Sequence, residues 1–123
     1  MAKILVVDDS SLARHLASAP LEEAGHRVLG VEPASLFDVL ASAYEFRPDL
    51  IITDYQMPNC NGLSLVRAIR EDPSLGRIRI MVLTAHRDNE LMERLLTLGI
   101  DGILFKGKGM QELVDRVGEI IGV

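Results

Sequence analysis

Five residues whose side chains could bind a cation or react follow short apolar runs along this chain. They are Asp8, Asp9, Asp54, Thr84 and Lys106. Carboxylates held close together repel one another and take up protons unless cations compensate their charge. Mg²⁺ suits such a group, because it binds one or two carboxylates, keeps several waters and completes its shell with phosphate oxygens. Together with an amine and a hydroxyl, this set predicts chemistry on a phosphoryl group.

Asp54 is the candidate nucleophile of this set. It stands alone after the middle apolar run, between the Asp8-Asp9 pair and Lys106. A carboxylate beside Mg²⁺ and an amine can attack phosphorus and become an aspartyl phosphate, a reaction that needs alignment and charge neutralisation above all. A simpler interpretation makes the acids N-caps of helices. For Asp8 or Asp9 taken alone, that interpretation is as good as the functional one. It does not explain why reactive groups follow four separate apolar runs.

The apolar runs themselves predict the strands of a parallel sheet. Continuous runs of this length fit strands that are covered on both faces. The three strongest are Ile4–Val7, Leu50–Ile52 and Ile80–Leu83. Two more mixed segments, Arg27–Val31 and Gly102–Phe105, are typical of the edges of the same sheet.

Amphipathic segments separate these runs and predict five helices. Their apolar stripes are Leu12, Leu16 and Ala24 with Ala13, Ala17 and Leu21 beside them; Leu36, Val39, Leu40 and Ala43; Leu65, Val66 and Ile69; Leu91, Met92, Leu95 and Leu98; and Leu113, Val114, Val117 and Ile120. We expect these side chains to be core. Five strand-helix units with right-handed crossovers give an α/β, doubly wound, five-stranded parallel sheet, with its ligand site at the carboxyl ends of the strands.

Length and composition limit the classes of protein that fit. The chain has 123 residues, which predicts one domain over residues 1–123. Thirteen Lys and Arg against 18 Asp and Glu give a net charge of −5, which argues against direct nucleic-acid binding. No apolar run approaches the roughly 18 residues of a membrane span. One cysteine, Cys60, excludes an internal disulfide, and we expect a cytoplasmic protein.

The chain resembles the receiver domain of two-component response regulators, including the stand-alone chemotaxis type. The resemblance runs from Lys3 to Val123 and rests on motifs in a fixed order. These are Val6–Ser10, Asp54–Gly62, Leu83–Ala85 and Phe105-Lys106. The resemblance implies a flavodoxin-like receiver fold with strand order 2-1-3-4-5 and five helices.

The resemblance also implies a metal site and a phosphoacceptor. Asp54 would take the phosphoryl group. Asp9 would hold Mg²⁺, with Asp8 behind it through water. Asp54 and the backbone carbonyl of Gln56 would complete the protein ligands of the cation.

Further roles concern the response to phosphorylation. Lys106 would contact the phosphoryl oxygens, and Thr84 would move its hydroxyl onto the phosphoryl group. The surface of the fourth helix, fifth strand and fifth helix would then shift between two states and bind a downstream protein target. Gln56 and His86, each two residues after a site residue, would tune the lifetime of the aspartyl phosphate; His86 is alternatively a solvated residue at the rim of the site.

The resemblance implies a sensor histidine kinase or a histidine phosphotransfer protein as the source of phosphoryl groups. The domain would act as a phosphorelay signalling module, catalysing only its own phosphorylation and dephosphorylation. Two alternatives are a phosphorylation-independent docking module and an Mg²⁺-dependent phosphohydrolase with an aspartyl-phosphate intermediate. Such hydrolases place Asp-x-Asp after the first strand, whereas Asp8 and Asp9 are adjacent.

Three positions depart from the family pattern. Gly107 replaces the usual Pro after the lysine, so we expect a trans peptide there, because a cis bond without Pro costs about 2.5–4 kcal/mol. Ile103 stands where the family often has an aromatic; Phe105, on the same strand face, either takes over its role or is ordinary core, which we favour. Pro20 lies inside the first helix pattern and predicts a kink or break near Ser18-Ala19.

Overall fold

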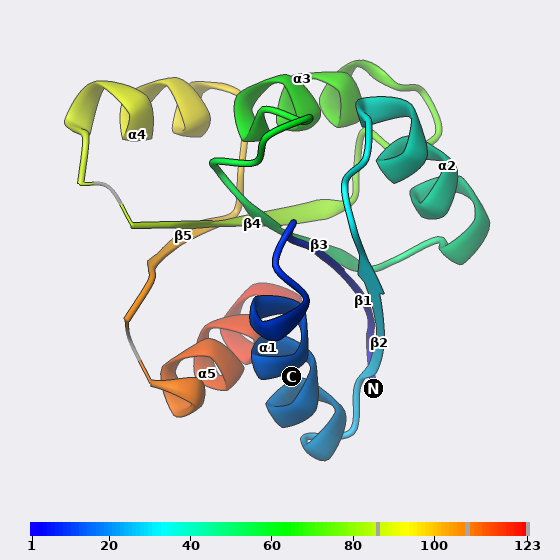
Figure 1. The fold of residues 1–123 in the computed structure, drawn as a ribbon, viewed down its shortest axis with the longest axis vertical. Coiled ribbons are helices and arrows are strands. Elements are labelled where there is room, and N and C mark those ends of the chain that lie inside the picture. Colours follow the sequence, from blue (N-terminus) through cyan, green and yellow to red (C-terminus); the bar gives the residue numbers. More distant parts are fainter. Residues whose placement is uncertain (86, 108, 123) are drawn as a thin grey trace.

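The computed structural model describes residues 1–85, 87–107 and 109–122. Within these residues, five strands alternate with five helices along the chain (Figure 1). The strands are β1 (Lys3–Val7), β2 (Arg27–Val31), β3 (Leu50–Asp54), β4 (Arg79–Thr84) and β5 (Gly102–Phe105). The helices are α1 (Ser11–Glu23), α2 (Leu36–Phe46), α3 (Gly62–Glu71), α4 (Asn89–Thr97) and α5 (Met110–Ile121).

The strands form one parallel sheet in the order β2-β1-β3-β4-β5. This confirms the predicted topology, and the two segments of mixed composition, β2 and β5, are its edges. The strand β3 lies in the middle, and its last residue, Asp54, pairs in register with Leu83 of β4. The carboxyl ends of the parallel strands therefore meet at one edge of the sheet, with Asp54 near its centre.

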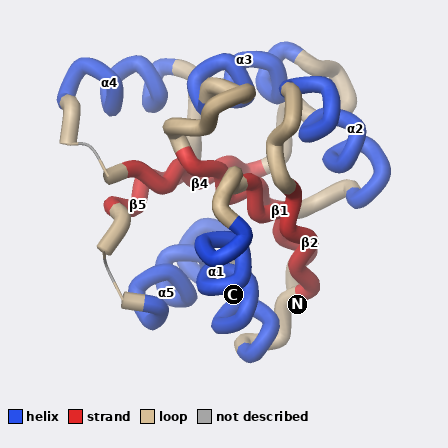
Figure 2. The backbone as a smooth tube through the Cα atoms, in the orientation of Figure 1, coloured by secondary structure: helices blue, strands red, loops and turns tan. Residues whose placement is uncertain are grey.

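Helices cover both faces of the sheet (Figure 2). The helices α1 and α5 lie on one face, and α2, α3 and α4 lie on the other (Figure 1). Successive strand residues point to opposite faces, so Ile4 and Val6 belong to the core under α1 and α5, while Leu5 and Val7 belong to the core under α2, α3 and α4. Because both faces are covered, the inner strands β1, β3 and β4 are largely apolar, which made them recognisable in the sequence.

Side chains at four helix starts accept hydrogen bonds from backbone N–H groups of the first turn. These N-caps are Ser10 for α1, Ser35 for α2, Asn61 for α3 and Asp88 for α4. For α1 the bond runs from the N–H of Ala13 to the hydroxyl of Ser10, at 3.1 Å. The simpler interpretation of Asp8 and Asp9 as caps of this helix is therefore wrong, because Ser10 is its N-cap. The Asp8 carboxylate instead accepts from the N–H of Ser10 itself, at 3.0 Å.

The helix α1 buries a different stripe from the one expected. Leu12 and Leu16 are 65% and 46% exposed, and Ala24 follows the end of the helix. Ala17 and Leu21 are buried instead, in the core shared with α5. The side of α1 that carries Ala17 and Leu21 thus faces the sheet and α5, and Leu12 and Leu16 are turned outward.

The helix α1 also runs without a break through Pro20. Of the predicted kink or break near Ser18-Ala19, the break is therefore wrong, and the kink stays a prediction. Proline removes one hydrogen bond, the one that would reach the carbonyl of Leu16. Its own carbonyl accepts from the N–H of Ala24 at 3.0 Å, so the last turn still closes.

The peptide bond between Lys106 and Gly107 is trans, as predicted. Gly107 has a φ of 94°, in the left-handed region that favours glycine. Proline could not adopt this angle, because its ring holds φ near −65°. The glycine therefore permits a backbone path after β5 that the usual family residue would forbid.

Candidate functional site

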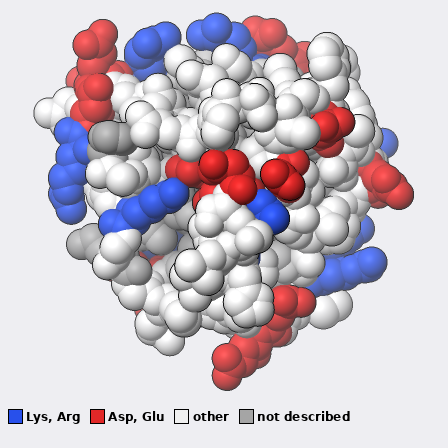
Figure 3. Space-filling view, viewed as in Figure 1, with Lys and Arg blue, Asp and Glu red and all other residues white. Residues whose placement is uncertain are grey.

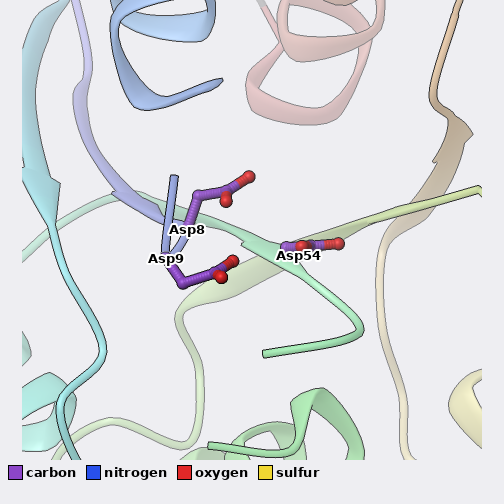
Figure 4. Close-up of side chains that lie close together, drawn as sticks. All are labelled: Asp8, Asp9 and Asp54. Carbon is purple, nitrogen blue, oxygen red and sulfur yellow. The ribbon is translucent and has the colours of Figure 1, made fainter. Parts of the chain in front are cut away.

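Acidic side chains gather near the middle of the face viewed in Figure 3. The sheet brings Asp8 and Asp9, which follow β1, close to Asp54 at the end of β3 (Figure 4). Each residue offers a carboxylate oxygen, and these three atoms lie within 4.8 Å of one another. Asp8 and Asp54 are buried, whereas Asp9 is exposed. The predicted clustering of the three acids is confirmed.

Lys106 supplies a positive charge to this cluster. Its Nζ lies 3.1 Å from a carboxylate oxygen of Asp54 and 3.8 Å from one of Asp8. The N–H of Lys106 donates to the carbonyl of Thr84 at 2.8 Å, so the β4-β5 pairing extends to this residue and positions the start of its side chain. The lysine thus approaches the two buried acids from the end of the edge strand β5, past the end of β4.

Burial dominates the electrostatics of Asp8. Removal from water raises the pKa of this carboxyl above its ordinary value, and the negative charge of Asp54 adds to the effect. The N–H of Ser10, 3.0 Å from an Asp8 oxygen, and the ammonium of Lys106 lower the same pKa. Charge crowding was the effect expected from the sequence, but loss of hydration is the larger cause.

The remaining predicted residues surround a small cavity next to Asp54. Its volume is about 200 Å³, and it is lined by Asp54, Gln56, Thr84, Ala85 and Lys106. Thr84 is buried, whereas Gln56 is exposed and also borders a polar groove beside Asp9. The cavity lies beside the acidic cluster, which it meets at Asp54, and it offers room for a small chemical group. His86 lies outside the described residues.

The donor set fits a hard divalent cation. Three carboxylates against the one ammonium that pairs with them leave a local charge of −2. Oxygen donors are the ligands that Mg²⁺ prefers, and it commonly binds one or two carboxylates while keeping several waters. A dication among these oxygens would balance the charge and relieve the repulsion between them.

Two arginines near the site escaped the sequence analysis. Arg14 of α1 donates from Nη1 to the carbonyl oxygen of Asp8 at 2.6 Å. Arg87 lies with its guanidinium carbon 4.3 Å from the centre of the Phe105 ring. Neither contact has a local sequence signal, because each joins segments that only the fold brings together.

The contact with Arg87 also changes the interpretation of Phe105. The ring is only partly buried and lies under a charged group, so Phe105 is not the ordinary core residue that we favoured. A guanidinium over an aromatic face is attractive, typically by about 0.5–1 kcal/mol at exposed sites. The connection between β4 and α4 is thereby linked to the end of β5.

Comparison with known proteins identifies the class to which this fold and site belong. Residues 4–118 match the family model of the response regulator receiver domain. The chain belongs to this family, so it is a receiver domain of two-component response regulators. Receiver domains are signalling modules, and they bind Mg²⁺ at an acidic cluster of the kind found here.

Individual relatives agree with this assignment. The chain is 32% identical over 122 residues to the response regulator GacA of Pseudomonas aeruginosa, covering 98% of this chain and 55% of GacA. It is 35% identical over 120 residues to the sensor histidine kinase AruS of the same species, covering 96% of this chain and 12% of AruS. Among solved structures, the chemotaxis response regulator CheY4 of Vibrio cholerae is 32% identical, with a TM-score of 0.88 and 98% of each chain covered.

None of the helices among the described residues combines the length and the apolar composition needed to cross a bilayer.

Proposed function

We propose that residues 1–123 form one receiver domain in which Asp54 accepts a phosphoryl group with the help of Mg²⁺. The observation that supports this most strongly is the convergence of three carboxylates and one ammonium at the carboxyl ends of β1, β3 and β5. The site is cytoplasmic in this proposal, where kinases and nucleotide-derived phosphoryl groups are found.

The reaction needs little from the protein beyond position and charge. An oxygen of Asp54 forms a bond to phosphorus while the bond from phosphorus to the donor breaks, and the donor leaves with the electron pair. The donor is a phosphohistidine of a sensor histidine kinase or of a histidine phosphotransfer protein. Lys106, 3.1 Å from Asp54, is placed to pair with an oxygen of the transferred group.

The metal ligands in this proposal are Asp9, Asp54, the backbone carbonyl of Gln56 and, through water, Asp8. When bound, Mg²⁺ supplies positive charge that screens the incoming phosphoryl oxygens from the carboxylates. The buried Asp8 and Asp54 contribute fixed negative charge, and the exposed Asp9 leaves the entrance open to solvent.

Phosphorylation would change the surface formed by α4, β5 and α5. The modification adds roughly 1.5–2 negative charges and new acceptor oxygens beside the hydroxyl of Thr84 and the ammonium of Lys106. Both residues lie at strand ends that lead into this surface. Reorientation of these two side chains would bias the surface toward the state that binds a downstream protein target.

An apolar groove between α1 and the start of α5 supports a docking surface for the phosphoryl donor. Its volume is about 410 Å³, and Asp8 and Lys106 are among the residues that line it. Leu16 and Met110, which also line it, are 46% and 56% exposed, and Leu12 nearby on α1 is 65% exposed. A helix of the donor packed here would cover these side chains and bring its histidine toward Asp54.

Gln56 is the described candidate for control of the lifetime of the phosphorylated state. It lines the cavity beside Asp54 and is exposed to solvent, where a hydrolytic water would arrive. The same expectation for His86 stays a prediction.

Phosphorylation by a small donor tests this proposal. The protein is incubated with MgCl₂ and acetyl phosphate or phosphoramidate, and intact-mass spectrometry follows the addition of one phosphoryl group. The wild type is expected to gain one group that is stable in acid and labile in base, as an acyl phosphate is. Asp54→Asn should abolish the adduct, whereas Asp38→Asn on the exposed start of α2 should leave it unchanged.

The other results distinguish the alternatives. No adduct and no Mg²⁺ binding by the wild type would refute the proposal and favour a phosphorylation-independent docking module. Rapid turnover of many phosphate esters would favour a phosphohydrolase. An adduct that survives Asp54→Asn would assign the phosphoacceptor to another residue.

A further inference from the structure

The turn that carries Asp8 and Asp9 is held from outside the acidic cluster by Arg14. This residue lies in the first turns of α1, where its N–H donates to the carbonyl of Ser10 at 3.0 Å. Its side chain reaches back toward the end of β1, and Nη1 donates to the carbonyl oxygen of Asp8 at 2.6 Å. Arg14 therefore ties the rigid start of a helix to the peptide unit that joins the two acids.

The edge strand β2 completes the support of this turn. The N–H of Asp8 donates to the carbonyl of Val31 at 3.3 Å. The stem of Arg14 passes over Gly30, where an added Cβ would lie 3.4 Å from its Cδ. Asp8 is thus held through its N–H by β2 and through its carbonyl by Arg14, and a small residue in β2 leaves room for the arginine stem.

This support matters because the acids repel one another. The carbonyl of Asp8 belongs to the same planar peptide unit as the N–H of Asp9, so a bond to this carbonyl restrains where Asp9 begins. The side chain of Asp8 is separately restrained by the N–H of Ser10, at 3.0 Å. Without Arg14, repulsion among oxygens within 4.8 Å would be free to rotate this peptide and move Asp9 away from the others.

We propose that Arg14 is a positioning residue of the cation site: by binding the carbonyl of Asp8, it holds Asp8 and Asp9 in the arrangement that receives Mg²⁺. This inference rests on the proposed function of the acidic cluster. Loss of a group that hydrogen-bonds to a metal ligand and orients it typically weakens metal binding by about 10–100-fold. We expect about tenfold for loss of Arg14. Arg14 touches neither the cation nor the phosphoryl group in this proposal.

The test compares Mg²⁺ binding by the wild type, Arg14→Met, Arg14→Lys and the control Arg67→Met, which removes an exposed arginine from α3. MgCl₂ is titrated at constant ionic strength while amide chemical shifts are followed by NMR. We expect Arg14→Met to bind Mg²⁺ about tenfold more weakly than the wild type. Arg14→Lys, which keeps one donor on a shorter side chain, should fall between them, and the control should match the wild type.

A second readout uses the metal-free protein. Arg14→Met is expected to shift the carbonyl ¹³C resonance of Asp8 and the amide resonances of Asp9 and Ser10, while resonances of the sheet interior stay in place. Mg²⁺ affinity of Arg14→Met within twofold of the wild type would overturn the inference. Weakened affinity that accompanies loss of native chemical-shift dispersion in both Arg14 variants would also overturn it, by assigning the effect to folding.

These results are separable from failure of the proposed function. A wild type that shows no Mg²⁺-dependent shifts would refute the cation site itself, on which this inference rests. If the wild type and Arg14→Met bind Mg²⁺ with equal affinity, the cation site stands and only the role of Arg14 is refuted.

Discussion

Asp8 shows how a residue suited to function opposes stability. Its carboxylate is almost fully buried and lies among two other acids. The hydrogen bond from Ser10 and the ion pair with Lys106 offset part of the lost hydration. Burial still leaves the pKa of this carboxyl raised, so its ionised form is disfavoured in the metal-free protein. A cation would remove this penalty, and the same residue would then stabilise the loaded form.

Replacement of Asp8 should therefore stabilise the metal-free protein in a pH-dependent way. Folding raises the pKa of Asp8, so the folded state favours the protonated form of this carboxyl. The contribution of the protonated form to the free energy of unfolding is present at low pH and is lost as pH rises through the folded pKa. Asn keeps an oxygen for the N–H of Ser10 and carries no charge. Asp8→Asn should match the wild type in acid and exceed its free energy of unfolding at neutral pH.

Urea denaturation in chelator at several pH values measures this difference, with the exposed Asp115→Asn as control. Parallel pH profiles for the wild type and Asp8→Asn would contradict the prediction, as would lower stability of the variant at neutral pH. Asp8→Asn should also weaken Mg²⁺ binding, since it removes one of the charges that attract the cation.

At the scale of elements, Arg70 joins three segments at the sheet edge opposite the site. It lies in the last turn of α3 and donates to the carbonyls of Gly99, Gly76 and Ile78. It also pairs with Asp101 at 3.2 Å, and the same Asp101 oxygen accepts from the N–H of Ile80 at 2.8 Å. This network fixes the starts of β4 and β5, whose other ends carry Thr84 and Lys106.

Removal of this side chain should lower stability without abolishing the chemistry. Arg70→Ala is expected to reduce the free energy of unfolding by about 2–3 kcal/mol, because several backbone carbonyls lose a charged donor. Urea denaturation measures the loss, and the exposed Arg67→Ala should stay within about 0.5 kcal/mol of the wild type. Phosphorylation of the folded Arg70→Ala protein by acetyl phosphate should persist; a variant that is stable but unreactive would contradict this division of roles.

At the scale of the whole molecule, the proposed function would place the acceptance of the phosphoryl group and the response to it on different strands of the sheet. Asp54 lies on the central strand, while Thr84 and Lys106 lie at the ends of β4 and of the edge strand β5. The contact between Arg87 and Phe105 links the β4-α4 connection to the same edge strand. A movement of Thr84 toward Asp54 would therefore reach the surface of α4, β5 and α5 through a short path.

Loss of the Thr84 hydroxyl should separate these two steps. Thr84→Val keeps the buried shape, so we expect Asp54 to be labelled by acetyl phosphate while the distant response is lost. Amide shifts on α4, β5 and α5 are compared with and without Mg²⁺ and beryllium fluoride, a phosphoryl mimic. The wild type and the control Thr97→Val on α4 should show shifts across this surface. Equally broad shifts in Thr84→Val would refute the coupling.

Local patterns in the chain were sufficient for the fold class, the strand segments and the reactive set. Apolar runs identify strands covered on both faces, and parallel strands bring their carboxyl ends together, so Asp8, Asp54 and Lys106 could be placed at one edge. The strand order itself came from the family resemblance. The fold class, the strand segments and the residues at their ends depend on the local apolar pattern and on the direction of the chain, and both can be read from the sequence.

Tertiary packing decided the features that depend on which segments meet. Both Ala17 and Leu16 fit an apolar stripe of α1, and only the space left by the sheet and α5 decided that the smaller residue is buried. The contacts of Arg14 with Asp8 and of Arg87 with Phe105 join separate segments through long, flexible side chains. Such contacts leave no period in the sequence, because their geometry exists only once the backbone has brought both ends together.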